Sequence, residues 1–261
     1  MLNKLFKHEM KANARFLLPL YLILFVLSLI NRVIIGLDIF DGALAIIPRF
    51  SIFAYIVSII AVIVVTFIIM IMRFYKNLLS DEGYLMFTLT VESHQLIISK
   101  LLTAAIWIVS SVLAVFASLL LVFANPDSIS EIWYQIRLGL TELDVIFKGR
   151  TTLLFIELAI LAIFGLIHNI LMIYLAIAIG HLFNGHKLLG SFVAYVGISM
   201  VMQTIISVLA AIVGSIFRES VTNVLSLPNF IFPIGIFTIL ILIVLYFFAT
   251  NYIFRNKLNL E

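Results

Sequence analysis

The sequence predicts an all-α polytopic membrane protein that crosses the bilayer with six transmembrane helices, and three observations support this fold class. The chain is 64% hydrophobic and only 11% charged, whereas soluble domains have about 45–50% apolar and about 25% charged residues. Its mean hydropathy is +1.25. The apolar residues are gathered into runs that reach the length a helix needs to cross a bilayer, about 20 residues.

Six such runs predict a single transmembrane domain over residues 1–261. The predicted spans cover about 16–36, 52–72, 101–124, 151–183, 191–217 and 230–253. The fourth run is longer than one straight span requires, so we expect it to continue into the cytoplasm or to bend near Gly165. Residues 218–233 carry two prolines, and this segment either dips into the outer leaflet or forms a loop.

The distribution of lysine and arginine predicts the orientation, because these residues are enriched in cytoplasmic loops. Six spans place both termini on one side, and ten of the sixteen basic residues fall there: Lys4, Lys7, Lys11, Arg15, Arg73, Lys76, Lys100, Lys187, Arg255 and Lys257. The other side has Arg32, Arg49, Arg137, Lys148, Arg150 and Arg218. Both termini are therefore predicted to be cytoplasmic, in a multi-pass protein of the cell membrane.

Residues 1–15 have the pattern of an amphipathic interfacial helix. The basic residues and His8 share one face at helical spacing, and apolar residues occupy the opposite face, where Glu9 and Asn13 are exceptions. Such a helix would lie on the cytoplasmic membrane surface with its lysines among anionic headgroups. The alternative is a basic tail with accidental periodicity. On the other side of the membrane, residues 125–150 predict a second interfacial helix, with Trp133 and Tyr134 at headgroup depth.

Several kinds of chemistry have no motif in this sequence. No cysteine is present, so the chain has no thiolate metal ligand. The phosphate-binding loop G-x-x-x-x-G-K-[ST], the metal motif H-E-x-x-H and the elbow G-x-S-x-G do not occur. The basic residues flank membrane spans and form no groove-binding face, so we expect no nucleic-acid partner. The chain is expected to have no ATPase or other enzymatic activity of its own, no bound cofactor and no metal.

Few polar residues lie within the predicted spans. Arg32 and Glu157 stand at similar depths, which predicts a buried ion pair, because an unpaired charge in hydrocarbon is costly. His168, Asn169 and Gln203 are the other strongly polar candidates. All five residues either line a polar translocation path or, in the simpler interpretation, hold the bundle together by interhelical contacts.

The segment 73–100, RFYKNLLSDEGYLMFTLTVESHQLIISK, separates the second and third spans and is longer than a turn requires. Arg73 and Lys76 anchor the end of one span, and residues 80–83 form a polar break in which Gly83 permits a change of direction. The apolar residues that follow would be exposed in water unless a partner protein covers them. The segment is therefore predicted to be a docking element, or otherwise an amphipathic stretch resting on the bilayer.

This segment resembles ABC-2 type permeases, the membrane subunits of bacterial ATP-binding-cassette exporters. The resemblance rests on the order basic-aromatic, Asp-Glu-Gly, aromatic, Phe-Thr-Leu and Ser-Lys over residues 73–102, and it extends to the basic N-terminal helix and the six-span layout. It implies that the loop between spans 2 and 3 contains a cytoplasmic coupling helix that seats on a separate ATPase. Where many relatives have proline after Phe-Thr-Leu, this chain has Thr90.

The resemblance implies a permease subunit that works with cytoplasmic ATPase subunits and a second permease of the same or a related chain. ATP and Mg²⁺ would be bound by the ATPase. The residues expected to couple the two proteins are Asp81, Glu82, Gly83, Tyr84, Phe87 and Val91. The apolar spans favour an amphiphilic cargo such as a peptide, a drug or a lipid-like molecule. The alternative is an ATP-independent secondary transporter or channel that uses Glu157 and His168; a membrane-embedded enzyme is a third possibility that the missing motifs disfavour.

Overall fold

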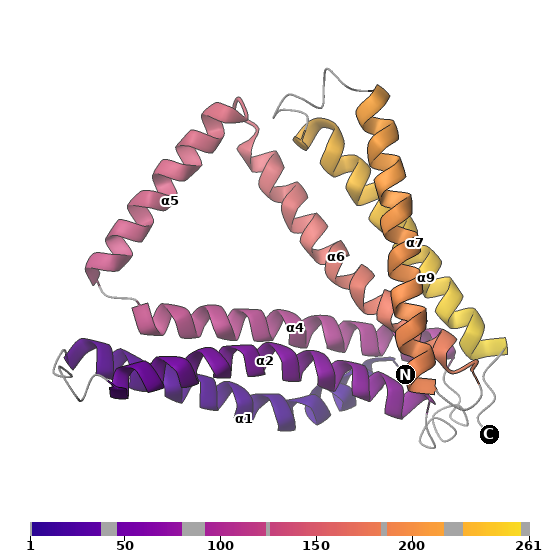
Figure 1. Ribbon diagram of the computed structural model, residues 1–261, viewed down its shortest axis with the longest axis horizontal. Helices are drawn as coiled ribbons and strands as arrows, with labels where there is room; N and C mark the ends of the chain where they lie inside the picture. The colour runs from indigo at the N-terminus through magenta and orange to yellow at the C-terminus, as the bar shows by residue number, and fades with distance from the viewer. Residues whose placement is uncertain are drawn as a thin grey trace. The chain divides into compact units, whose positions relative to one another are not determined.

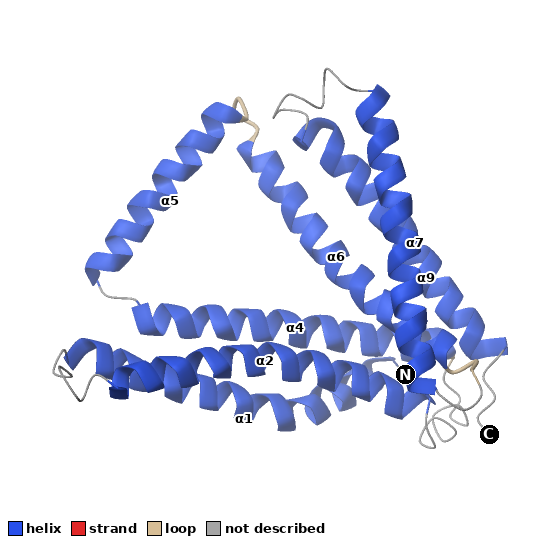
Figure 2. Cartoon of the chain, viewed as in Figure 1, coloured by secondary structure: helices blue, strands red, loops and turns tan. Residues whose placement is uncertain are grey.

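The protein is helical throughout the residues that its computed structural model describes, which are 2–37, 46–79, 92–123, 126–183, 187–216 and 227–256 (Figures 1 and 2). These ranges contain helices and turns but no strand. The helices are α1 (Leu2–Leu37), α2 (Ile46–Leu79), α4 (Ser93–Phe123), α5 (Pro126–Ile146), α6 (Thr151–Gly180), α7 (Lys187–Ile216), the short π-helix η2 (Leu227–Ile231) and α9 (Phe232–Asn256).

Six of these helices, α1, α2, α4, α6, α7 and α9, are long and apolar enough to cross a membrane, which confirms the six predicted spans. All of them except α6 extend beyond the apolar run of the sequence at one end or both. The 34 residues of α2 measure about 50 Å at about 1.5 Å per residue, whereas the hydrocarbon core is about 30 Å thick. The ends of α2 therefore extend past the hydrocarbon core into the headgroup region.

Contacts divide the chain into two compact units. Unit 1 comprises residues 1–74 and 95–133, and therefore contains α1 and most of α2 and α4. Unit 2 comprises residues 75–94 and 134–261, and contains α6, α7, η2 and α9. Within each unit the three long helices lie alongside one another (Figure 1).

The leader and the first span form one continuous helix, α1, instead of an interfacial helix followed by a separate span. Pro19 lies inside α1 without ending it, although a proline in a helix interior removes one hydrogen bond. Side chains on the basic face of the leader are exposed, and those of Glu9 and Asn13 are buried. At these two residues the face that we expected to rest on lipid packs against α2 and α4 instead.

The helix predicted within residues 125–150 is present as α5, which begins at Pro126, a residue suited to the first helical position. Trp133 is 68% exposed and Tyr134 57% exposed, and their location at headgroup depth stays a prediction. Of residues 218–233, only those from Leu227 onward are described, as η2 and the start of α9.

Hydroxyl groups join the helices of unit 1 along their buried faces. The Ser111 hydroxyl on α4 lies 2.7 Å from the Tyr21 hydroxyl on α1 and 2.8 Å from the Thr66 hydroxyl on α2. Farther along, the hydroxyls of Tyr55 and Ser118 are 2.9 Å apart. Small hydroxyl residues let transmembrane helices approach closely and bond across the contact. These bonds fix the register of the three helices relative to one another.

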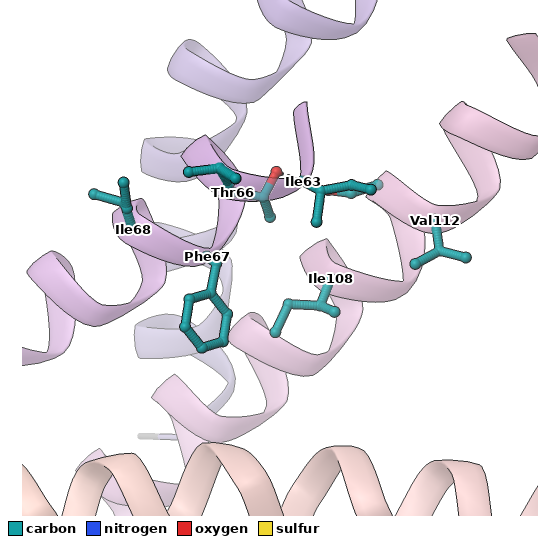
Figure 3. Close-up of a pocket in the computed structure, with 8 residues that line it drawn as sticks. Ile63, Thr66, Phe67, Ile68, Ile108 and Val112 are labelled. Carbon is teal, nitrogen blue, oxygen red and sulfur yellow. Dashed lines mark hydrogen bonds between the residues drawn. The ribbon is translucent and has the colours of Figure 1, made fainter. Parts of the chain in front are cut away.

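A cavity of about 240 Å³ lies beside the contact between Thr66 and Ser111. Figure 3 shows it between α2 and α4, with Ile63 and Phe67 on one helix and Ile108 on the other. Thr66 and Ser111 are the polar residues that line it, and their hydroxyls bond to each other; the other lining residues are apolar. The cavity therefore offers no charged group for binding or catalysis.

In unit 2, α6 and α7 meet most closely at the turn that joins them. A Cβ atom at Gly180 would overlap the backbone and the hydroxyl of Ser191, and a Cβ at Gly190 would stand 3.1 Å from the Gly180 carbonyl oxygen. Only glycine lets two helix backbones approach this closely. The contact places the last turn of α6 directly against the first turns of α7.

We predict that Tyr21→Phe destabilises the protein by about 1 kcal/mol, because it removes a buried interhelical hydrogen bond. Thr66→Val should cost a similar amount, and the double variant should cost less than the sum, since both hydroxyls bond to Ser111. Unfolding free energies in bilayer discs would measure this. Ser199→Ala is the control, because the Ser199 hydroxyl bonds only to Tyr195 of its own helix among the described residues. Strictly additive effects would contradict the shared network.

Candidate functional site

The residues that the sequence analysis assigns to ATPase coupling lie in the segment 80–91, which is outside the described residues. They are Asp81, Glu82, Gly83, Tyr84, Phe87 and Val91. The structure does describe the helices on either side of this segment, because α2 ends at Leu79 and α4 begins at Ser93. The site can therefore be characterised from its two flanks.

A buried ionic cluster joins these flanks to α1. Glu9 accepts a hydrogen bond from Lys100 Nζ on α4 at 2.8 Å through one carboxylate oxygen. Its other oxygen accepts a hydrogen bond from Arg73 Nη1 on α2 at 3.3 Å. Glu9 and Lys100 are each only 5% exposed. We call Glu9, Arg73 and Lys100 the charged cluster.

The energetics of this cluster are set by burial. Removing an ion from water costs several kcal/mol, and only good geometry with an opposite charge repays that cost. Glu9 meets this condition twice, because each oxygen faces a different cation. A single carboxylate thus holds the end of α2 that leads into residues 80–91 and the start of α4 that leads out of them.

Sequence reasoning missed the role of Glu9. The sequence analysis placed Arg73 at the end of one span and Lys100 at the start of another, and treated Glu9 and Asn13 as exceptions on an apolar face. The structure gives both exceptions a partner, since Asn13 Nδ2 points to Met70 Sδ at 3.9 Å on α2. An acid on the apolar face of a helix next to a span was the available signal.

A second contact beside the segment 80–91 lies in unit 2. The ring of Tyr75 is centred 5.2 Å from the ring of His181, the residue that follows α6. Burial, together with the positive charge of Lys187, lowers the pKa of His181 to about 4. His181 is therefore neutral near pH 7 and can pack against an aromatic ring. His186, five residues later in the sequence, lies outside the described residues.

The predicted pair of Arg32 and Glu157 spans the two units, since Arg32 belongs to unit 1 and Glu157 to unit 2. Arg32 Nη1 donates a hydrogen bond to the Leu121 carbonyl at 3.0 Å. Glu157 Oε2 is buried and has no hydrogen-bond partner among the described residues. The pairing of these two side chains stays a prediction.

The other predicted polar residues fall into two places. His168 and Asn169 line one cavity of about 410 Å³ with residues of α7, η2 and α9. Gln203 instead lies on a surface of α7 with Thr204 and Ser207. Glu157 lines neither of these sites. His168 and Asn169, which are neighbours in the sequence, therefore line the same cavity. Gln203 lies on another face of α7 than the one that borders this cavity.

Comparison of the chain with known protein families, with curated proteins and with solved structures found no match. Among the residues that the structure describes, no group of three histidine, aspartate or glutamate side chains could hold a metal ion.

We predict that Glu9→Gln destabilises unit 1 by about 3–5 kcal/mol, because it removes the carboxylate that pairs with buried Lys100 and partly buried Arg73. The double variant Glu9→Gln with Lys100→Met should recover much of the loss. Thermal and chemical unfolding of the purified protein in bilayer discs would measure both. Lys7→Met, an exposed change on the same helix, is the control. A Glu9→Gln effect as small as that of Lys7→Met would contradict the assigned role of the cluster.

We also predict a pH dependence that originates at His181. Its folded pKa of about 4 lies below the ordinary value of 6.5, so the unfolded chain binds a proton more readily between these values. The stability that this residue contributes is complete above about pH 6.5 and declines as the pH falls towards 4. Unfolding midpoints measured from pH 7.5 to 4.5 should fall less steeply for His181→Gln than for the unmodified protein. Parallel curves would exclude this origin.

Proposed function

We propose that this chain is the permease subunit of an ABC-2 type exporter, driven by a separate ATPase that docks on residues 80–91. The six spans, the absence of a phosphate-binding loop and the resemblance over residues 73–102 support the proposal. ATP and Mg²⁺ would be bound by the partner ATPase, and this chain would convert its movement into transport of an amphiphile. Both termini would then be cytoplasmic in a cell-membrane protein.

The charged cluster is the observation that carries this proposal. A docking segment transmits force only if the helices at its two ends move together with the rest of the bundle. Arg73 and Lys100 stand on those two helices, and both bond to Glu9 of a third. Separating α1 from α4 would break the buried pair of Glu9 and Lys100, and separating α1 from α2 would break the partly buried pair of Glu9 and Arg73. Breaking a buried ion pair is costly. A push on residues 80–91 would thus move α1, α2 and α4 as one body.

The surface of α7 supports a second permease in the assembly. No residue in the most apolar stretch of α7 is buried within the chain. Gln203, Thr204 and Ser207 share an exposed groove on that helix, and the last two hydroxyls bond to carbonyl groups of α7 itself. An exposed glutamine amide within hydrocarbon requires a partner or a polar path. A second copy of the chain that faces α7 would supply either one.

The alternative, an ATP-independent transporter or channel, has one observation in its favour. Glu157 Oε2 and His168 Nδ1 are both buried without a hydrogen-bond partner among the described residues, and buried ionisable groups in membrane helices often belong to ion or proton pathways. His168 lines the cavity between α6, α7 and α9, whereas Glu157 is not among the described residues that line it.

We predict that Tyr84→Asp combined with Phe87→Asp abolishes transport and transport-stimulated ATP hydrolysis, because two charges would be forced into an apolar protein contact. The chain would be purified with the ATPase that co-isolates with it and reconstituted into liposomes for both measurements. Val145→Asp is the matched control, since Val145 is 79% exposed and lies on α5, which we expect on the other side of the membrane.

The outcomes separate the two functions. Loss of both activities in the loop variant, with normal activity of Val145→Asp, supports docking at residues 80–91. Unchanged coupling in the loop variant would refute it. Transport that persists without any ATPase and disappears in Glu157→Gln would instead establish the ion-coupled alternative.

A further inference from the structure

Unit 2 has a partly open cavity that α6, α7, η2 and α9 form within a single chain. Its volume is about 410 Å³, which lies within the range of small-molecule sites, about 300–1,000 Å³. Isoleucine, leucine and valine side chains, including Leu209 of α7 and Ile234 of α9, provide most of the wall. Three polar residues, His168, Asn169 and Thr238, interrupt it. Sites that bind small molecules have this composition of apolar walls with a few fixed polar groups.

The polar residues of the wall present hydrogen-bond acceptors. Asn169 Nδ2 donates to the Gly165 carbonyl at 2.8 Å, and its side-chain oxygen makes no hydrogen bond to another described residue. The Thr238 hydroxyl donates to the Ile234 carbonyl at 2.8 Å, which leaves its lone pairs to accept. A ligand group that donates a hydrogen bond, such as a hydroxyl or an amine, would satisfy these oxygens.

Gly165 opens the cavity without serving the packing of the protein. It lies near the middle of α6, where glycine costs about 1 kcal/mol relative to alanine in soluble helices. A Cβ atom built at Gly165 meets no other atom within 4 Å, whereas one at Gly180 overlaps Ser191. Close helix contact therefore explains Gly180 but not Gly165. The missing side chain at Gly165 leaves space on the cavity side of α6.

We infer that this cavity binds a compact, largely apolar molecule that donates a hydrogen bond to Asn169 and Thr238. A cavity of this volume admits a drug-sized amphiphile. As a statement about transported cargo the inference rests on the proposed export function, but binding to the cavity does not depend on an ATPase. His168 would form one wall of the site, because it lines the cavity. The centre of its ring lies 5.2 Å from that of Tyr246, and this contact would hold the ring in place.

Photolabelling of the purified full-length chain in bilayer discs tests this inference directly. The probe is a trifluoromethyl-aryl diazirine that carries a benzyl alcohol, which combines an apolar ring with one hydroxyl donor. The matched probe lacks the hydroxyl. Labelled residues are identified by peptide mass spectrometry. We expect the alcohol probe to label the cavity residues about fivefold more than its analogue does, the ratio that one net hydrogen bond provides.

Three variants complete the test. Asn169→Leu should reduce the advantage of the alcohol probe severalfold, and Gly165→Leu should block both probes by filling the cavity. Gly197→Leu is the control for Gly165→Leu, because a Cβ there also meets no other atom and Gly197 does not line the cavity. If Gly165→Leu does not insert into the membrane, Ala210→Phe fills the same space from α7.

Equal labelling by the two probes, spread over lipid-facing residues and unchanged in the cavity-filling variant, would overturn the inference. It would identify the cavity as ordinary lipid-filled surface. Because no nucleotide or ATPase is present, a negative result here leaves the export proposal standing. Conversely, failure of the docking experiment leaves this binding site unaffected.

Discussion

A carboxylate that is withdrawn from water among packed helices has to find positive charge close by, and Glu9 imposes this condition on unit 1. Arg73 and Lys100 satisfy it from two different helices. Farther along the same three helices, the hydroxyl contacts of Tyr21, Thr66 and Ser111 join α1, α4 and α2 again. The ion pairs of the charged cluster and the hydroxyl contacts therefore both stabilise the same packing of α1, α2 and α4.

Unit 2 is organised differently. Its closest helix contact depends on glycine. Glu157 Oε2, His168 Nδ1 and the Tyr246 hydroxyl are buried in it without a hydrogen-bond partner among the described residues, although unit 1 also has such atoms, among them Asn13 Oδ1 and Trp107 Nε1. A satisfied polar network makes a bundle rigid, whereas unsatisfied groups favour binding or rearrangement. What distinguishes unit 1 is therefore its charged cluster and the hydroxyl contacts between its helices.

Hydropathy predicted the six spans because crossing a bilayer requires long apolar helices, and no tertiary contact can substitute for that requirement. The ends of the helices were less predictable. α1 begins at Leu2 although the apolar run starts near residue 16, and Glu9 and Asn13 of this extension contact α4 and α2. His168 and Asn169 were recognisable as polar residues within a span. Their common cavity was not, because it depends on which faces of α6, α7 and α9 meet.

The glycine contact at the turn between α6 and α7 has a geometric consequence for the whole of unit 2. α6 and α7 touch at this end and diverge towards the other, as Figure 1 shows. The hollow beside Gly165 lies in the wedge that this divergence creates, and α9 closes only part of it. The two helices thus form a V whose apex is at Gly180. A small rotation of α6 against α7 at this contact would change the separation most at their far ends, Thr151 and Ile216.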